Sequence, residues 1–166
     1  MNLGERYQHL LTCANLIYTH DHLPYFASLA GDVLEIGCDV GNSTTAFLYG
    51  ASLSVTSIDL NPRCAENFPG LAKWRFIAGD SRALTTISQV ADQVFDVLFI
   101  DGDHSYETAA ADLANYSDLV RRGGLILMHD VCCPDTYPGV RRAFDEFPLG
   151  EKSIREGSYG LGVIQL

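Results

Sequence analysis

Apolar positions along this chain of 166 residues alternate between two periods. Short continuous apolar runs, typical of strands buried on both faces, predict strands at 32–36, 54–60, 74–78, 95–100 and 124–128. Between these runs, apolar residues at helical spacing predict helices at 43–49, 62–68, 81–90 and 106–120. Such alternation predicts an α/β fold, in which helices cover both faces of a largely parallel sheet.

The two ends of the chain depart from this alternation. After a predicted helix at 140–147, segments 152–156 and 159–166 have the pattern of strands, and the short glycine-containing link between them predicts an antiparallel hairpin. Residues 3–30 are expected to form two helices. We therefore expect one domain, 1–166, with an N-terminal helical cap (1–30) on a catalytic core (31–166).

Composition and charge narrow the class of protein. Hydrophobic residues make up 47% of the chain and charged residues 19%, and no apolar run has the length of a membrane span. The N-terminus lacks a signal-peptide pattern, so we expect a cytoplasmic protein. A net charge of −10 and few clustered basic residues argue against nucleic acid as a partner. Five cysteines without Cys-x-x-Cys spacing indicate reduced thiols.

The segment from Asp32 to Ser43 places two glycines between a buried strand and a helix start. Gly37 and Gly41 allow close backbone approach or positive φ, and the first N–H groups of a helix attract anions. A nucleotide-like or carboxylate-bearing cofactor is expected here, the alternative being a turn without a ligand. The dinucleotide motif Gly-x-Gly-x-x-Gly is missing, because Asp39 and Asn42 replace its last two glycines, which disfavours a nicotinamide oxidoreductase.

Polar residues follow the predicted strands where each strand ends. They cluster at 37–43, 59, 80–81, 101–104 and 129–130. Ligands of open α/β sheets bind outside the carboxyl ends of the strands, so we expect these clusters to meet at one surface.

The order Glu-x-Gly-x-x-x-Gly-x-Ser, followed by Asp59 after the next strand, resembles the first motif of class I S-adenosylmethionine-dependent methyltransferases. The Gly-x-x-x-Gly-x-Ser form is similar to the catechol and sugar O-methyltransferase branch. Asp-Gly-Asp-His-Ser-Tyr and His-Asp-Val resemble a bacterial and phage-type group. The resemblance covers about 30–166. It implies a Rossmann-like, doubly wound, mostly parallel seven-stranded sheet with an antiparallel C-terminal hairpin, and S-adenosyl-L-methionine as cofactor.

The resemblance assigns the methionine end of the cofactor to the glycine turn. Ser43 and the N–H groups near Gly41 would hold the methionine carboxylate, and Gly37 would allow close approach. Glu35, under the turn, is expected to orient the loop or the amino group.

The other end of the cofactor is assigned to later strands. Asp59 matches the acidic residue that binds both ribose hydroxyls, although it could instead cap the turn at Asn61. Asp80 and Ser81 match the position that contacts adenine, although Ser81 could be a helix N-cap. Asp101 is expected to lie beside the cofactor as well.

A metal site is the third expectation. Adjacent parallel strands lie about 4.8 Å apart, so Asp101, His129 and Asp130 can converge on one cation. In metal-dependent O-methyltransferases the matching pattern is an Asp at the end of the first strand and an acidic pair, or Asp-Asn, at the end of the second, and here His129 replaces an oxygen ligand. Magnesium prefers oxygen ligands, whereas imidazole suits Mn, Fe, Ni or Zn better. Three interpretations stay open: a divalent cation such as Mg or Mn, His129 as a metal-free general base, or structural polar residues.

Methyl transfer to an alcohol or phenol requires that the hydroxyl lose its proton. His104 occupies the offset of the base in catechol-type enzymes, and Asp103 that of the base in sugar-type relatives. His104 could instead simply start a helix.

These observations predict a methyltransferase that acts on a hydroxyl of a small molecule, a sugar or a phenol, with or without a divalent metal. The alternatives are a non-catalytic S-adenosylmethionine-binding protein and a methyltransferase for a nitrogen or protein acceptor. The chain is short for this family, which suggests a homo-oligomer that closes the site.

Overall fold

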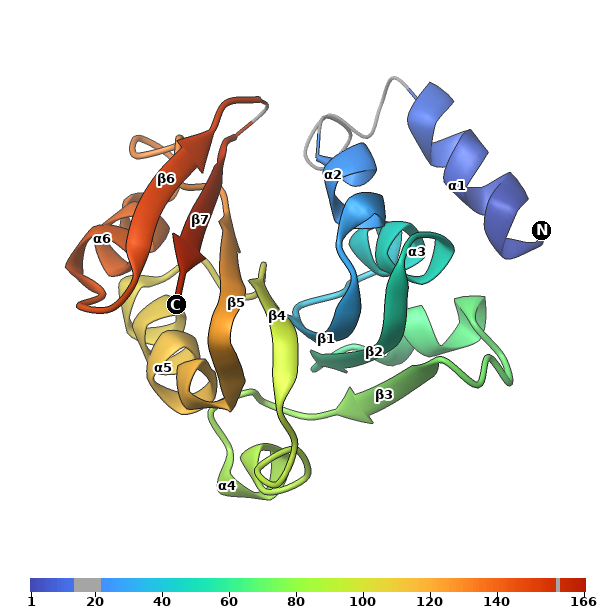
Figure 1. Cartoon of the computed structure of the whole chain (residues 1–166), viewed down its shortest axis with the longest axis horizontal. Helices are drawn as coiled ribbons and strands as arrows, with labels where there is room; N and C mark the ends of the chain where they lie inside the picture. Colours follow the sequence, from blue (N-terminus) through green and yellow to red (C-terminus); the bar gives the residue numbers. More distant parts are fainter. Residues whose placement is uncertain (14–21, 158) are drawn as a thin grey trace.

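The computed structural model describes residues 1–13, 22–157 and 159–166. In these ranges seven strands form one sheet with the order β3-β2-β1-β4-β5-β7-β6 (Figure 1). β1 to β5 are parallel, and β7 pairs antiparallel with both β5 and β6. The predicted sheet and its C-terminal hairpin are confirmed. The strands are β1 Gly31–Ile36, β2 Ser52–Asp59, β3 Trp74–Ala78, β4 Phe95–Ile100, β5 Val120–His129, β6 Glu151–Arg155 and β7 Leu161–Gln165.

Helices cover both faces of this sheet, and alternate side chains along each strand pack in two separate apolar clusters. On β1, Leu34 and Ile36 pack in the cluster that contains α5 and α6, whereas Val33 packs in the cluster that contains α1, α2 and α3. Figure 1 shows these two groups of helices on opposite sides of the sheet. The helices are α1 Leu3–Thr12, α2 Leu23–Ser28, α3 Asn42–Tyr49, α4 Leu84–Ile87, α5 Tyr106–Tyr116 and α6 Pro138–Glu146, with 3₁₀ turns at Pro62–Asn67 and Ser117–Leu119.

Several boundaries differ from those predicted from the sequence. The expected helix at 81–90 is a single turn, α4, in which β-branched residues such as Thr85 and Thr86 lower helix propensity. The expected strand at 124–128 begins earlier, at Val120, because the chain passes through Gly123 at φ 78° and shifts register against β4. Such an irregularity is typical of a β-bulge, which a periodicity argument does not detect.

The N-terminal helices lie against α3, on one side of the sheet. α1 begins with a capping box, in which Asn2 and Glu5 each satisfy the backbone N–H of the other. The predicted cap includes residues 14–21, which lie outside the described ranges, and its role over the site stays a prediction. Among the described helices, none has the length and apolar character needed to cross a membrane.

Candidate active site

A cavity of about 710 Å³ opens at the carboxyl ends of β1, β2, β4 and β5, where the sequence predicts the ligand. This volume is within the range typical of small-molecule sites. Among the predicted site residues, it is lined by Gly37, Asp59, Asp80, Ser81, Asp101, Asp103, His104, His129 and Asp130. Glu35, Gly41 and Ser43 are placed next to it but do not line it.

The loop between β1 and α3 requires glycine at both predicted positions. Gly37 has φ 84°, and a Cβ there would lie 2.1 Å from the carbonyl oxygen of Asp101. Gly41 has φ 83°, and a Cβ there would lie 2.6 Å from the ring of Phe68. The first glycine therefore lets the loop pack against the end of β4, and the second lets it pack against the 3₁₀ turn.

Below this loop, Glu35 is fully buried and accepts three hydrogen bonds from hydroxyl groups. Ser43 donates to Oε1 at 2.5 Å, while Thr44 and Ser57 each donate to Oε2 at 2.6 Å. Burial raises the pKa of Glu35 to about 7, against the lowering effect of these hydroxyls. Glu35 thus ties β1 to the first turn of α3 and to β2, and the hydroxyl of Ser43 points inward to it.

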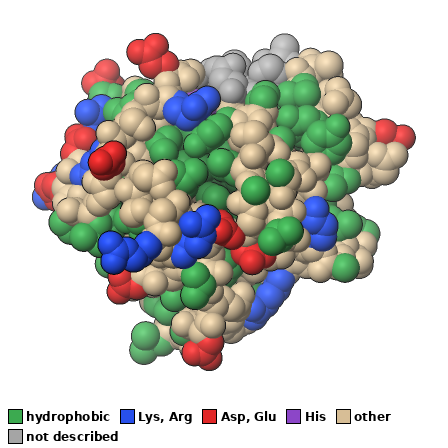
Figure 2. Space-filling view, viewed as in Figure 1, with side chains coloured by type: hydrophobic (Ala, Val, Ile, Leu, Met, Phe, Trp, Pro, Cys, Tyr) green, Lys and Arg blue, Asp and Glu red, His purple; other side chains and the backbone are tan. Residues whose placement is uncertain are grey.

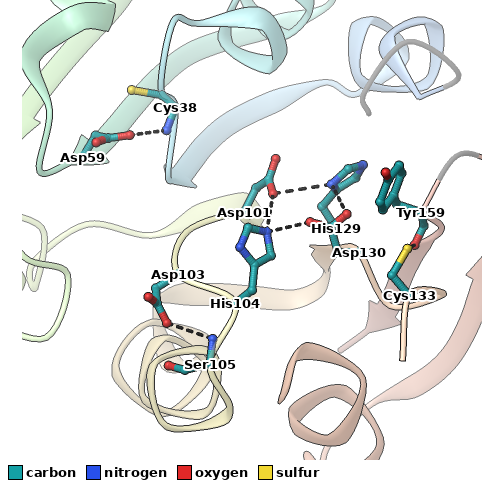
Figure 3. Close-up of polar contacts among 10 residues, drawn as sticks. All are labelled: Cys38, Asp59, Asp101, Asp103, His104, Ser105, His129, Asp130, Cys133 and Tyr159. Carbon is teal, nitrogen blue, oxygen red and sulfur yellow. Dashed lines mark hydrogen bonds and ion pairs between the residues drawn. The ribbon is translucent and has the colours of Figure 1, made fainter. Parts of the chain in front are cut away.

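Asp59, at the end of β2, holds the same loop from the cavity side. Its Oδ2 accepts from the backbone N–H of Cys38 at 2.8 Å (Figure 3) and from that of Asp39 at 2.9 Å. Its Oδ1 accepts from the N–H of Asn61 at 2.8 Å. The N-cap of the 3₁₀ turn after β2 is Asn61, so the alternative that Asp59 caps this helix is wrong. Asp59 lines the cavity, as its assignment to the ribose requires.

At the β3 end of the cavity, Asp80 is paired with a residue that the sequence argument missed. Arg82 donates to both oxygens of Asp80, from Nε at 3.0 Å and from Nη2 at 2.8 Å. These bonds lower the pKa of Asp80 to about 2. The cap of α4 is Ala83, so the alternative that Ser81 caps a helix is wrong.

Four side chains from the ends of β4 and β5 form a compact acidic and imidazole cluster (Figure 3). His104 Nε2 lies 2.6 Å from Oδ2 of Asp130 and 3.8 Å from Oδ1 of Asp101. His129 Nδ1 lies 3.2 Å from Oδ1 of Asp130 and 3.5 Å from Oδ1 of Asp101. Each imidazole therefore faces both carboxylates, and the predicted convergence of these two strand ends is found.

The charges in this cluster stabilise one another. Burial alone would lower the pKa of His129, but Asp101 and Asp130 outweigh it and raise the pKa to about 10. Burial would raise the pKa of Asp130, but hydrogen bonds from His104 and His129 lower it to about 2. The hydrogen bond to Asp130 raises the pKa of His104 above its ordinary 6.5.

The two candidate bases, Asp103 and His104, point in different directions (Figure 3). Asp103 accepts from the backbone N–H of Ser105 at 2.8 Å, at the start of α5, and bonds from Ser105 lower its pKa. His104 turns toward the cluster, and the ring of Tyr137 stacks on it with centroids 4.1 Å apart. The geometry favours His104 over Asp103 as a proton acceptor.

Donor atoms for a divalent cation lie at the ends of β4 and β5. Within the described ranges, Asp101, His104 and Asp130 each offer one ligand atom, and these atoms lie within 4.8 Å of one another. Two carboxylates and one imidazole fit a divalent cation, and the imidazole favours manganese over magnesium. The sequence expected His129 as the nitrogen ligand, whereas the donor set that has this spacing contains His104.

On the face of the molecule in Figure 2, Lys and Arg side chains are scattered among Asp and Glu side chains. A continuous basic surface, which nucleic-acid binding requires, is not formed on that face.

Other residues of the site gave weaker signals in the sequence. Arg82 and Tyr137 lie in loops, where no periodicity indicates their direction. Asp112 is fully buried on α5, and in the sequence it is recognisable only as a charged residue within an otherwise apolar stripe of that helix.

Comparison with known proteins identifies the family of the chain. A family described as a methyltransferase domain matches residues 34–131, from β1 to just beyond β5, and the chain therefore belongs to this family. The match includes the glycine loop and the cluster at β4 and β5, and the predicted class of enzyme is confirmed. No curated protein matches the chain significantly.

Solved structures show the same fold at low sequence identity. The Podospora anserina methyltransferase PaMTH1, solved with S-adenosylhomocysteine (SAH), is 17% identical with a TM-score of 0.72, over 98% of this chain and 86% of that one. An O-methyltransferase from Bacillus cereus, solved in complex with SAH, is 19% identical with a TM-score of 0.67, over 99% and 90%. The MycE methyltransferase of mycinamycin biosynthesis, solved with Mg, SAH and mycinamycin VI, is 15% identical with a TM-score of 0.69, over 99% of this chain but 54% of MycE.

Proposed function

We propose that this methyltransferase uses S-adenosyl-L-methionine to methylate a hydroxyl group of a small molecule, with His104 as the general base. The observation that carries this proposal is the pair of His104 and Asp130, 2.6 Å apart, in the cavity that the glycine loop borders. Membership of the methyltransferase family supports the reaction type. The SAH-bound relatives support the cofactor, and the Bacillus cereus O-methyltransferase supports oxygen as the acceptor.

The order of the strands supports one direction for the cofactor across the cavity. Asp80 and Ser81 follow β3, Asp59 ends β2, and Gly37 follows β1, so these residues succeed one another along the edge of the sheet. Adenine at the β3 end and ribose at Asp59 would leave the methionine at the glycine loop. The sulfonium then lies toward the β4 and β5 ends, where His104 is found.

Methyl transfer is an in-line displacement at an already activated carbon, so the protein mainly aligns the reactants. His104 takes the proton of the acceptor hydroxyl, the oxygen forms a bond to the methyl carbon, and the electron pair of the S–CH₃ bond returns to sulfur. The products are a methyl ether, neutral SAH and protonated His104. Asp130 orients the imidazole through Nε2 and stabilises its protonated form, which leaves Nδ1 as the basic nitrogen.

Asp101, His104 and Asp130 are also the residues that would hold a divalent cation. When bound, the cation would supply a lower pKa for a coordinated acceptor hydroxyl. The nitrogen of His104 that lies near both carboxylates, Nε2, is the one now bonded to Asp130, and a coordinated His104 would not act as base. Metal assistance and base catalysis by His104 are therefore alternatives that one experiment can separate.

The test measures SAH formation from S-adenosylmethionine with a panel of sugars and phenols. His104→Gln keeps a side-chain amide near Asp130 but cannot take a proton, so turnover should fall by about 10²–10⁴ while SAH affinity is retained. The matched control is His9→Gln, an exposed histidine on α1, which should behave as wild type. Unchanged turnover in His104→Gln would refute the role of His104.

The same assay with EDTA separates the two alternatives. Activity that survives EDTA assigns proton transfer to His104 alone, whereas loss that Mn²⁺ restores assigns it to the cation. SAH binding without turnover on any hydroxyl acceptor would favour a non-catalytic binding protein or a nitrogen or protein acceptor.

A further inference from the structure

A carboxyl group lies buried under the cavity, outside the residues that the proposed reaction uses. Asp112, on α5, has 0% of its surface exposed. Neither of its oxygens has a hydrogen-bond partner of normal geometry among the described residues. Burial raises the pKa of this group to about 6, so the carboxylate is available at neutral pH. Buried polar groups are nearly always satisfied, so this carboxyl indicates a partner or a role.

The surroundings of Asp112 lead to the β3 end of the cavity. A Cβ built on Gly102, which lines the cavity, would lie 3.7 Å from Oδ2 of Asp112. Burial raises the pKa of Asp112, and the hydroxyl of Ser81, which also lines the cavity, lowers this pKa in part. Asp112 is therefore directly behind the wall of the cavity.

A second residue of α5 acts on the same part of this wall. Tyr116 lies one turn after Asp112, is fully buried, and donates its hydroxyl to the carbonyl oxygen of Ser81 at 2.6 Å. Helix α5 thus faces both the carbonyl and the hydroxyl of Ser81. Asp80, next to Ser81, already accepts hydrogen bonds from Arg82 with both of its oxygens. The hydroxyl of Ser81 is therefore the polar group that we consider for the purine at the β3 end of the cavity.

We propose that Asp112 is a positioning residue that accepts the hydroxyl hydrogen of Ser81, so that Ser81 presents only lone pairs to the purine of the cofactor. A hydroxyl has one hydrogen to donate and two lone pairs, and without a partner it can match either kind of group. With its hydrogen bound to Asp112, Ser81 selects a donor, which is the 6-amino group of adenine. A 6-oxo purine, which presents an acceptor there, is excluded. This inference rests on the proposed function, which places adenine beside Ser81.

The experiment compares the affinities for SAH and for its deaminated analogue, S-inosylhomocysteine, by titration calorimetry. We expect wild type to prefer SAH by about tenfold or more, which corresponds to one hydrogen bond. Asp112→Leu should lose most of this preference, chiefly through tighter binding of the analogue. A role limited to folding would weaken both ligands equally and leave their ratio unchanged.

Two further variants keep the result interpretable. Leu113→Ala, the matched control from the same buried face of α5, should lower the melting temperature but preserve the ratio. Ser81 lies in a loop. Ser81→Ala should lose the preference for SAH to the same extent as Asp112→Leu, and the variant with both substitutions should lose no more of it.

The outcomes distinguish this inference from the function on which it rests. A wild type that binds SAH but does not prefer it to the analogue overturns the inference, as does a Ser81→Ala variant that keeps the full preference. If Asp112→Leu does not fold, Ser81→Ala decides alone. A folded wild type that binds neither ligand refutes the proposed cofactor instead.

Discussion

Replacing the buried carboxyl of Glu35 by an amide should change how the stability of the protein depends on pH. Glu35 is fully buried and accepts hydrogen bonds from Ser43, Thr44 and Ser57. Glutamine has nearly the same shape, and the hydroxyls can rotate to bond its amide. Glu35→Gln should therefore fold, while it removes the group whose ionisation burial opposes.

The magnitude follows from the pKa of Glu35, which burial raises from 4.5 to about 7. Because the folded protein holds this proton more tightly than the unfolded chain, the group's contribution to stability is fully present below about pH 4.5. It is lost as pH rises through about 7, and the whole loss is about 3 kcal/mol. About 2 kcal/mol of it falls between about pH 5.5 and 8.5, above the isoelectric point near 4.7.

The assay is urea unfolding of wild type and Glu35→Gln at about pH 5.5 and 8.5. The difference between their free energies of unfolding cancels the other titrating groups, and it should move in favour of the variant by about 2 kcal/mol as pH rises. Glu66→Gln, an exposed position, controls for the loss of a charge. A difference between wild type and Glu35→Gln that does not change with pH would show that the pKa of Glu35 is not raised by folding.

Three further predictions concern the cofactor loop and the base. Gly37→Ala should abolish SAH binding in calorimetry, because its Cβ would lie 2.1 Å from the carbonyl oxygen of Asp101; unchanged affinity would contradict this packing. Arg6→Ala should weaken SAH binding by about tenfold, because Arg6 donates to the carbonyl of Val40 at 2.5 Å and thereby braces the loop from α1; equal affinities would show that α1 is not coupled to the site. The kcat of wild type should rise with pH through a pKa above 6.5, because His104 must be neutral to take a proton and the bond to Asp130 raises its pKa; a pH-independent kcat between about pH 6 and 9 would exclude His104 as base.

The fold could be predicted from the sequence because strand-length apolar runs and helical stripes determine the layers directly. The hairpin at the C-terminus could be predicted for the same reason. The lengths of α4 and β5 could not, since a one-turn helix and a bulge at Gly123 depend on local packing rather than on period.

The positions of the site residues followed from the rule that polar strand ends meet at one edge, but side-chain directions did not. Ser43 was expected at the methionine carboxylate, yet its hydroxyl turns to Glu35, which was itself expected under the turn. His104 and His129 both follow strands, and only their ring orientations decide which nitrogen joins the carboxylates in a donor set. Asp112 carried a readable signal, a carboxylate on the apolar stripe of α5.

We propose that this cavity holds S-adenosylmethionine for methyl transfer. Titration calorimetry of SAH against the wild-type protein, with NADH as the control ligand, tests it most directly. We expect saturable binding of one SAH per chain and no heat of binding with NADH. A folded protein that binds NADH, or that binds no SAH with or without Mn²⁺, would contradict it.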